Sequence, residues 1–99
     1  MKIIFAGTPE FAARHLEIVL QSEHEVLSVL TQPDRKSGRG KKINFSPVKQ
    51  TALDNGISIH QPESLGIEKV FSDLKNITPD LILVVAYGLL VPKKILELP

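Results

Sequence analysis

A cluster of basic residues is the part of this sequence best suited to bind a charged partner. The segment Arg35–Lys49 holds six of the twelve lysine and arginine residues and no acidic residue. The rest of the chain holds the other six basic residues and all eleven acidic ones, so a body of net charge −5 carries a segment of +6. This composition suits a polyanion. Arginine side chains can bind a phosphate through two nitrogens, lysines add point charges, two glycines keep the backbone pliable, and the ring of Phe45 offers a stacking face. Charge alone leaves DNA, RNA, phosphorylated metabolites and a plain solvated loop as alternatives.

The sequence motifs for dinucleotide, nucleoside triphosphate and metal binding are incomplete or missing in this chain. Only Gly7 follows the first apolar run, where a dinucleotide site needs Gly-x-Gly-x-x-Gly. The run Gly40-Lys41-Lys42 lacks the serine or threonine of a P-loop. His15, His24 and His60 have no partner at metal-ligand spacing, and there is no cysteine. We therefore expect no metal site, and the lack of cysteine suits a cytosolic protein.

Two kinds of residue have both a structural and a functional interpretation. Glu10, Asp34 and Asp80 occupy positions typical of caps and turns, which is the interpretation we favour. Tyr87 and Gly88 directly follow the most apolar run of the chain. They could form a pocket wall with close backbone approach, or simply the turn that leaves a strand.

Apolar runs and helix-breaking residues predict an alternation of strands and helices. Strands are predicted at residues 3–6, 26–30, 57–59 and 81–86. Helices are predicted at residues 11–21, 46–55, 64–77 and 92–98. The basic segment between the second strand and the second helix matches neither pattern, so we expect a structureless loop of roughly 13–15 residues there.

Cap residues mark where the predicted helices begin. Thr8 is expected to cap the first helix, with Pro9 at the first helical position. Ser46 and Pro47 repeat that arrangement before the second helix, and Ser64 is expected to cap the third. Asn55-Gly56 predicts a left-handed end to the second helix.

This order of elements predicts an α/β fold that is the first half of a doubly wound, Rossmann-like parallel sheet with strand order 3-2-1-4. Ligands bind such sheets beyond the carboxyl ends of the strands, where the strand order reverses. Residues 7–9 and 86–88 should therefore face each other across a crevice. The fourth strand is too apolar for a sheet edge, so a fifth strand beside it is expected.

Three stretches of the sequence together resemble one enzyme family. They are Ile3 to Ala13, Thr31 to Lys49 with its Gly38-Arg39-Gly40-Lys41-Lys42 core, and Val84 to Gly88 followed by Leu90, Pro92 and Leu96. The whole chain, residues 1–99, resembles the amino-terminal part of the catalytic domain of methionyl-tRNA formyltransferases. These enzymes transfer a formyl group from 10-formyltetrahydrofolate to the amino group of methionine on initiator tRNA, for translation initiation.

The resemblance implies roles for individual residues. The basic loop would enter the acceptor arm of the tRNA through Arg39, supported by Arg35, Lys41 and Lys42. The aminoacyl end of the tRNA would lie near Gly7, Thr8, Pro9 and Phe11. The folate cleft would be bordered by Tyr87, Gly88 and Leu89.

The resemblance also implies what these residues lack. The catalytic Asn, His and Asp of the family, and its carboxy-terminal tRNA-binding domain, are expected after Pro99, so no catalytic residue is assigned to this chain and it should be inactive alone. We expect a cytoplasmic, monomeric full-length enzyme that binds neither membrane nor DNA. Two alternatives remain: a formyltransferase that uses 10-formyltetrahydrofolate on a nucleotide sugar or purine precursor, and a non-catalytic RNA-binding module.

Overall fold

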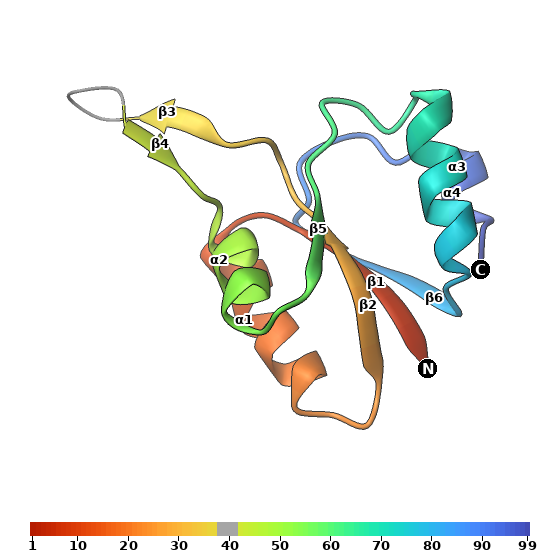
Figure 1. The fold of residues 1–99 in the computed structure, drawn as a ribbon, viewed down its shortest axis with the longest axis horizontal. Helices are drawn as coiled ribbons and strands as arrows, with labels where there is room; N and C mark the ends of the chain where they lie inside the picture. The colour runs from red at the N-terminus through yellow and green to blue at the C-terminus, as the bar shows by residue number, and fades with distance from the viewer. Residues whose placement is uncertain (38–41) are drawn as a thin grey trace.

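A four-stranded parallel sheet forms the centre of the molecule (Figure 1). The computed structural model describes residues 1–37 and 42–99, with the side chains of all of these except Lys36, Ser37 and Lys42. The sheet has the order β5-β2-β1-β6 and consists of β1 (Lys2–Gly7), β2 (Glu25–Leu30), β5 (Ser58–His60) and β6 (Leu81–Val85). Numbered along the chain, these strands have the order 3-2-1-4, which confirms the predicted topology.

Helices cover both faces of the sheet. Helices α1 (Glu10–Leu20) and α2 (Pro47–Asp54) lie on one face, and α3 (Glu68–Ile77) and α4 (Lys93–Leu96) lie on the other (Figure 1). Each face has its own apolar cluster. The first cluster contains Phe5, Ala12, Ala13, Leu16, Val29, Val48 and Ala52. The second contains Ile4, Ala6, Leu30, Leu65, Leu74, Tyr87 and Ile95.

The first strand is buried on both faces, as its continuous apolar run predicts. Phe5 points into the cluster under α1 and α2, while Ile4 and Ala6 point into the cluster under α3 and α4. Successive side chains of a strand alternate between the two faces, and β1 pairs with β2 on one side and β6 on the other. The strand therefore fixes both layers of helices relative to the sheet.

The cap residues were predicted with mixed success. Ser46 caps α2 as expected: its hydroxyl accepts a hydrogen bond from the Lys49 amide at 3.0 Å. The prediction for Thr8 is wrong, because Pro9 occupies the cap position of α1 and the Thr8 hydroxyl bonds elsewhere. The prediction for Ser64 is also wrong, because its hydroxyl accepts from the Gly66 amide in a turn and α3 begins only at Glu68.

The basic segment contains an antiparallel hairpin, where we expected a structureless loop. Strand β3 (Arg35–Ser37) pairs with β4 (Lys42–Asn44), with Arg35 opposite Asn44 and Ser37 opposite Lys42. The hairpin extends away from the main sheet (Figure 1). The expectation failed because both strands are short and polar, so they carry no apolar alternation. Gly38, Arg39, Gly40 and Lys41 lie outside the described residues.

The chain leaves β6 through a left-handed residue. Ala86 has φ of +50°, a conformation that alanine adopts only when the surroundings impose it. Among the described residues β6 pairs with β1 alone, and Leu81 and Val84 of β6 are exposed, so the expected fifth strand stays a prediction. Within residues 1–37 and 42–99, no helix has the length and apolar character needed to cross a membrane.

Candidate functional site

The carboxyl ends of β1 and β6 meet at the point where the strand order reverses. The Thr8 hydroxyl donates a hydrogen bond of 2.7 Å to the carbonyl oxygen of Tyr87. The side-chain amide of Gln32, which follows β2, donates to the same carbonyl at 3.1 Å. The Gln32 backbone amide in turn donates to the Thr8 hydroxyl at 3.3 Å. Residues 7–9 and 86–88 therefore lie side by side as predicted, with Gln32 joining them.

Gly88 is required at this junction for two reasons. Its φ of +91° is strained for any residue with a side chain. A Cβ on Gly88 would also collide with the side-chain amide of Gln32. The backbone at Gly88 can therefore approach the Gln32 amide more closely than any other residue would allow.

Tyr87 turns its side chain away from the junction. The ring is only 2% exposed and belongs to the cluster under α3 and α4, which Leu89 also contacts. Burial raises the pKa of Tyr87 to about 12, so its hydroxyl stays protonated at any physiological pH. The hydroxyl has no hydrogen-bond partner among the described residues. What Tyr87 presents to the junction is its backbone carbonyl.

Phe11 lies on the exposed surface of α1, just beyond the junction. Its side chain is 62% exposed, and its ring lies 4.5 Å from the ring of His15, one turn along the helix. The His15 ring also contacts the Phe11 carbonyl oxygen through Nδ1 at 2.8 Å. A large aromatic ring left in solvent beside the junction is available for contact with a partner.

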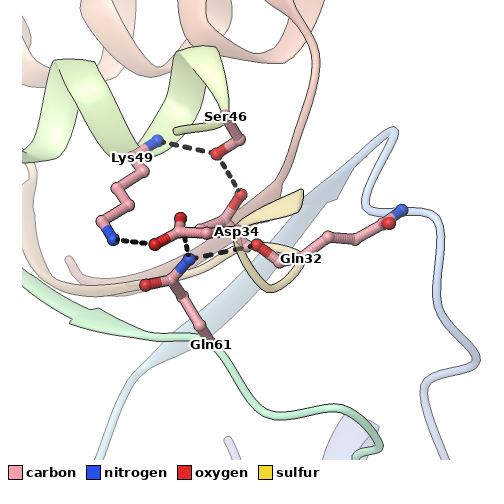
Figure 2. Close-up of polar contacts among 6 residues, drawn as sticks. Gln32, Asp34, Ser46, Lys49 and Gln61 are labelled. Atoms are coloured by element: carbon pink, nitrogen blue, oxygen red, sulfur yellow. Dashed lines mark hydrogen bonds and ion pairs between the residues drawn. The ribbon is translucent and has the colours of Figure 1, made fainter. Parts of the chain in front are cut away.

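A polar network ties the base of the hairpin to the sheet (Figure 2). The Lys49 ammonium donates to one carboxylate oxygen of Asp34 at 2.8 Å, and the side-chain amide of Gln61 donates to the other at 2.8 Å. The same Gln61 amide reaches the Gln32 carbonyl at 3.2 Å. The two hydrogen bonds to the carboxylate, first that of Lys49 and then that of Gln61, hold the pKa of Asp34 below its usual value. Asp34 therefore has a structural role, as expected, although it lies directly before β3 and not in a turn or a cap.

The basic residues of the segment are not equivalent. Lys49 lies over the Phe45 ring at 3.9 Å and pairs with Asp34, so its charge is already compensated within the protein. Arg35 is exposed and donates from Nη2 to the side-chain oxygen of Gln32 at 2.8 Å, which leaves its other nitrogen donors for a partner. The Lys42 backbone lies in β4. Arg39 and Lys41, which were expected to contact tRNA, lie outside the described residues.

Two hollows flank the hairpin base. The smaller has a volume of about 150 Å³ and is lined by residues that include Thr8, Gln32 and Arg35. The larger, of about 530 Å³, lies along α1 and α2 and is lined in part by Glu10 and Glu17. Carboxylates repel a polyanion, so the smaller hollow, which connects the junction to the hairpin, suits such a partner better. In the described part of the chain no three acidic or histidine side chains are grouped as metal ligands.

Comparison with known families identifies the chain. The profile of the formyl transferase family matches residues 1–99. The chain belongs to the formyl transferase family.

The chain resembles two other proteins along all of its 99 residues. It is 54% identical to methionyl-tRNA formyltransferase of Ectopseudomonas mendocina strain ymp, covering 100% of this chain and 32% of that protein. It is 50% identical to methionyl-tRNA formyltransferase of Pseudoalteromonas translucida strain TAC 125, covering 100% of this chain and 31% of that one. The chain thus spans about a third of the length of these relatives.

A solved structure of much lower sequence identity has the same fold as this chain. The crystal structure of phosphoribosylglycinamide formyltransferase from Bacillus halodurans superposes with a TM-score of 0.68 over 99% of this chain and 51% of that chain. Sequence identity is 13%, so this likeness concerns the fold alone.

Sequence reasoning missed two polar residues at these strand ends, Gln32 and Gln61. Neither carries a charge or titrates, so neither stood out by chemistry. Both, however, come just after the carboxyl end of a strand: Gln61 directly follows β5, and Gln32 follows β2 with Thr31 between them. That position is where α/β sheets place ligand-binding residues, and it is the signal that would have found them.

Proposed function

We propose that the protein to which these residues belong transfers a formyl group from 10-formyltetrahydrofolate to the amino group of methionine on initiator tRNA. The family supports formyl transfer, and the names of relatives at 54% and 50% identity support this acceptor. The structural observation that carries the proposal is a basic hairpin fastened beside the junction of β1 and β6. A formyl transferase that acts on a small acceptor would not need a projecting basic hairpin to bind that acceptor.

The hairpin would supply the electrostatic part of tRNA binding. Its contacts with the acceptor arm are assigned to Arg39, Arg35, Lys41 and Lys42. Arg35 supports this role, because it is exposed and yet oriented by Gln32. Lysine and arginine that neutralise phosphates release bound counterions, which makes the affinity depend on salt concentration. The alternative acceptors, a nucleotide sugar or a purine precursor, carry too few phosphates to engage a projecting hairpin of this kind.

The junction would bind the reacting ends of both substrates. Gly7, Thr8, Pro9 and Phe11 are assigned to the aminoacyl end of the tRNA, which is supported by the exposed Phe11 ring. The turn of Tyr87, Gly88 and Leu89 is assigned to the border of the folate cleft. Its contribution there would come from the backbone at Gly88, since the Tyr87 side chain is committed to the core.

The chemical step would need groups from outside residues 1–99. Formyl transfer requires an uncharged amine nucleophile, a base that accepts its proton and donors that stabilise the oxyanion. At the junction the Thr8 hydroxyl and the Gln32 amide already donate to the Tyr87 carbonyl. We therefore expect a polypeptide of residues 1–99 to be inactive alone. An assay with labelled formyl donor should detect no formyl-methionyl-tRNA, and product formed by this polypeptide would contradict the expectation.

Salt dependence of tRNA binding tests the role of the hairpin. In the full-length protein, Arg39→Ala should weaken binding of methionyl-tRNA by about 1–3 kcal/mol, and Arg39→Ala or Lys41→Ala should lower the slope of log K against log salt by about 1 for each lost phosphate contact. Filter binding over a range of salt concentrations measures both quantities. Lys75→Ala, on the exposed surface of α3, removes the same charge far from the hairpin and should leave the slope unchanged. An unchanged slope for Arg39→Ala and Lys41→Ala would exclude the hairpin from tRNA binding.

A further inference from the structure

In the described part of the chain, the hairpin is attached to the body of the protein mainly through the two segments at its base. Among the described residues, β3 and β4 contact each other far more than they contact any other helix or strand. They form a separate two-stranded sheet that extends away from the main one (Figure 1). The direction in which the hairpin points is therefore determined at its base, by the chain that enters β3 and the chain that leaves β4.

Two hydrogen-bonded links connect these two segments. The first joins the hydroxyl of Thr31, on the entering side, to that of Ser46, on the leaving side, at 2.6 Å. The second joins Asp34, directly before β3, to Lys49, in the first turn of α2, at 2.8 Å (Figure 2). Gln61 adds a third attachment, because its amide binds both Asp34 and the Gln32 carbonyl.

The ion pair at this base differs from an ordinary surface ion pair. The side chains of Lys49 and Asp34 are only 14% and 26% exposed, whereas those of the α1 pair Arg14–Glu10 are 75% and 68% exposed. The Lys49 ammonium is also held against the Phe45 ring at 3.9 Å. A charge with partners on two sides loses little further freedom on pairing and is weakly screened by salt. The pair is thus able to fix one geometry of the hairpin base.

We propose that Asp34, together with Lys49 and Gln61, acts as a positioning residue that directs the basic hairpin toward the polyanion. The inference rests on the proposed function, in which the hairpin binds tRNA. It makes Lys49 part of the support of the hairpin, so Lys49 is not expected to contact phosphate. It also predicts an effect on affinity opposite to that of charge alone. Loss of the negative charge at Asp34 should weaken binding of a polyanion, whereas charge alone would strengthen it.

Two single variants and their combination test this role in the full-length protein. Asp34→Asn and Lys49→Met should each raise the Kd for methionyl-tRNA about tenfold, and the double variant should raise it by no more than about the same factor, since both changes break one link. The salt slope should stay unchanged, because no phosphate contact is lost. The Kd for the formyl-folate should also stay unchanged. The matched control is Glu23→Gln, which removes one acidic charge in the exposed turn before β2 and should change the Kd less than about twofold.

Three results would overturn the proposal. One is Asp34→Asn that binds tRNA as well as or better than the unaltered protein. Another is a double variant whose Kd rises by the product of the two factors found for the single variants. The third is a salt slope that falls by about 1 in Lys49→Met, which would make Lys49 a direct phosphate contact. If the ion-pair variants unfold, Gln61→Met removes the third attachment outside the ion pair and should still raise the Kd about threefold. Binding by Gln61→Met equal to that of the unaltered protein would then overturn the proposal.

Arg39→Ala, measured alongside, separates this inference from the proposed function. If Arg39→Ala weakens tRNA binding and Asp34→Asn does not, the hairpin binds RNA and only the positioning role is wrong. If neither variant weakens binding, the proposed function of the hairpin fails as well.

Discussion

Replacement of Tyr87 by alanine should lower the free energy of unfolding by roughly 3–5 kcal/mol, the range typical of large aromatic side chains removed from a core. The Tyr87 ring is 2% exposed and packs in the cluster that contains Ile4, Leu74 and Ile95. Truncation would leave a cavity between the sheet and the helices of that face. Urea unfolding of the full-length protein measures the loss. Weaker folate binding in this variant would therefore not by itself place the Tyr87 side chain in the site.

Tyr87→Phe is the matched control for that loss. It keeps the ring and removes a buried hydroxyl that has no hydrogen-bond partner among the described residues. Deletion of an unsatisfied buried polar group costs little and can stabilise a protein. We expect the free energy of unfolding of Tyr87→Phe to equal or slightly exceed that of the unaltered protein, with folate binding unchanged. A loss above about 1 kcal/mol would show that the hydroxyl has a partner in the folded enzyme.

Gly7→Ala should destabilise the protein by about 3 kcal/mol, because the new methyl group has no room. A Cβ on Gly7 would lie 2.7 Å from Ala12 Cβ, 2.7 Å from the Val85 carbonyl oxygen and 2.9 Å from the Phe5 ring. Two of these contacts are close to the backbone of β6 and α1, which cannot move without separating β1 from its neighbours. The variant should also bind both substrates less tightly, since the displaced strands end at the proposed site.

Gly66→Ala is the control for Gly7→Ala. A Cβ on Gly66 would meet Ser64 Oγ at 3.5 Å, which is ordinary van der Waals contact, and no positive φ is involved. The free energy of unfolding should change by less than about 0.5 kcal/mol. Thermal unfolding of the two variants side by side gives the comparison, and equal stability of Gly7→Ala and Gly66→Ala would contradict the steric account.

The parts of the fold that depend on apolar patterning were predictable from the sequence. The continuous apolar runs of β1 and β6 predicted parallel strands, and these strands adjoin each other in the sheet. Burial was confirmed for β1 alone, because Leu81 and Val84 of β6 are exposed. Their order along the chain then predicted the switch point and the pairing of Thr8 with the Tyr87 turn. Ser46-Pro47 and Asn55-Gly56 marked both ends of α2, with Gly56 at φ of +67°. In each case a local preference and the global fold required the same conformation.

The hairpin and its supports were not predictable in the same way. Strands β3 and β4 pair with each other, and their described side chains, those of Arg35, Ile43 and Asn44, are exposed, so the strands leave no hydrophobic signature. The glycines Gly38 and Gly40 between them are typical of hairpin connections, a signal that the charge of the segment obscured. The roles of Gln32, Asp34 and Gln61 depend on contacts between residues 15 to 55 positions apart. Such contacts follow from the three-dimensional arrangement of strand ends, which a single sequence does not encode locally.

The central claim is the proposal that the basic hairpin lets the full-length protein act on tRNA. The most direct test is kcat/KM for formylation of methionyl-tRNA by the full-length protein, with and without the Arg39→Ala and Lys41→Ala substitutions, over a range of salt concentrations. We expect the unaltered protein to formylate methionyl-tRNA, and the doubly substituted protein to show kcat/KM lowered at least about tenfold with a weaker salt dependence. Failure of the unaltered protein to formylate methionyl-tRNA, or equal kcat/KM for both proteins at every salt concentration, would contradict the claim.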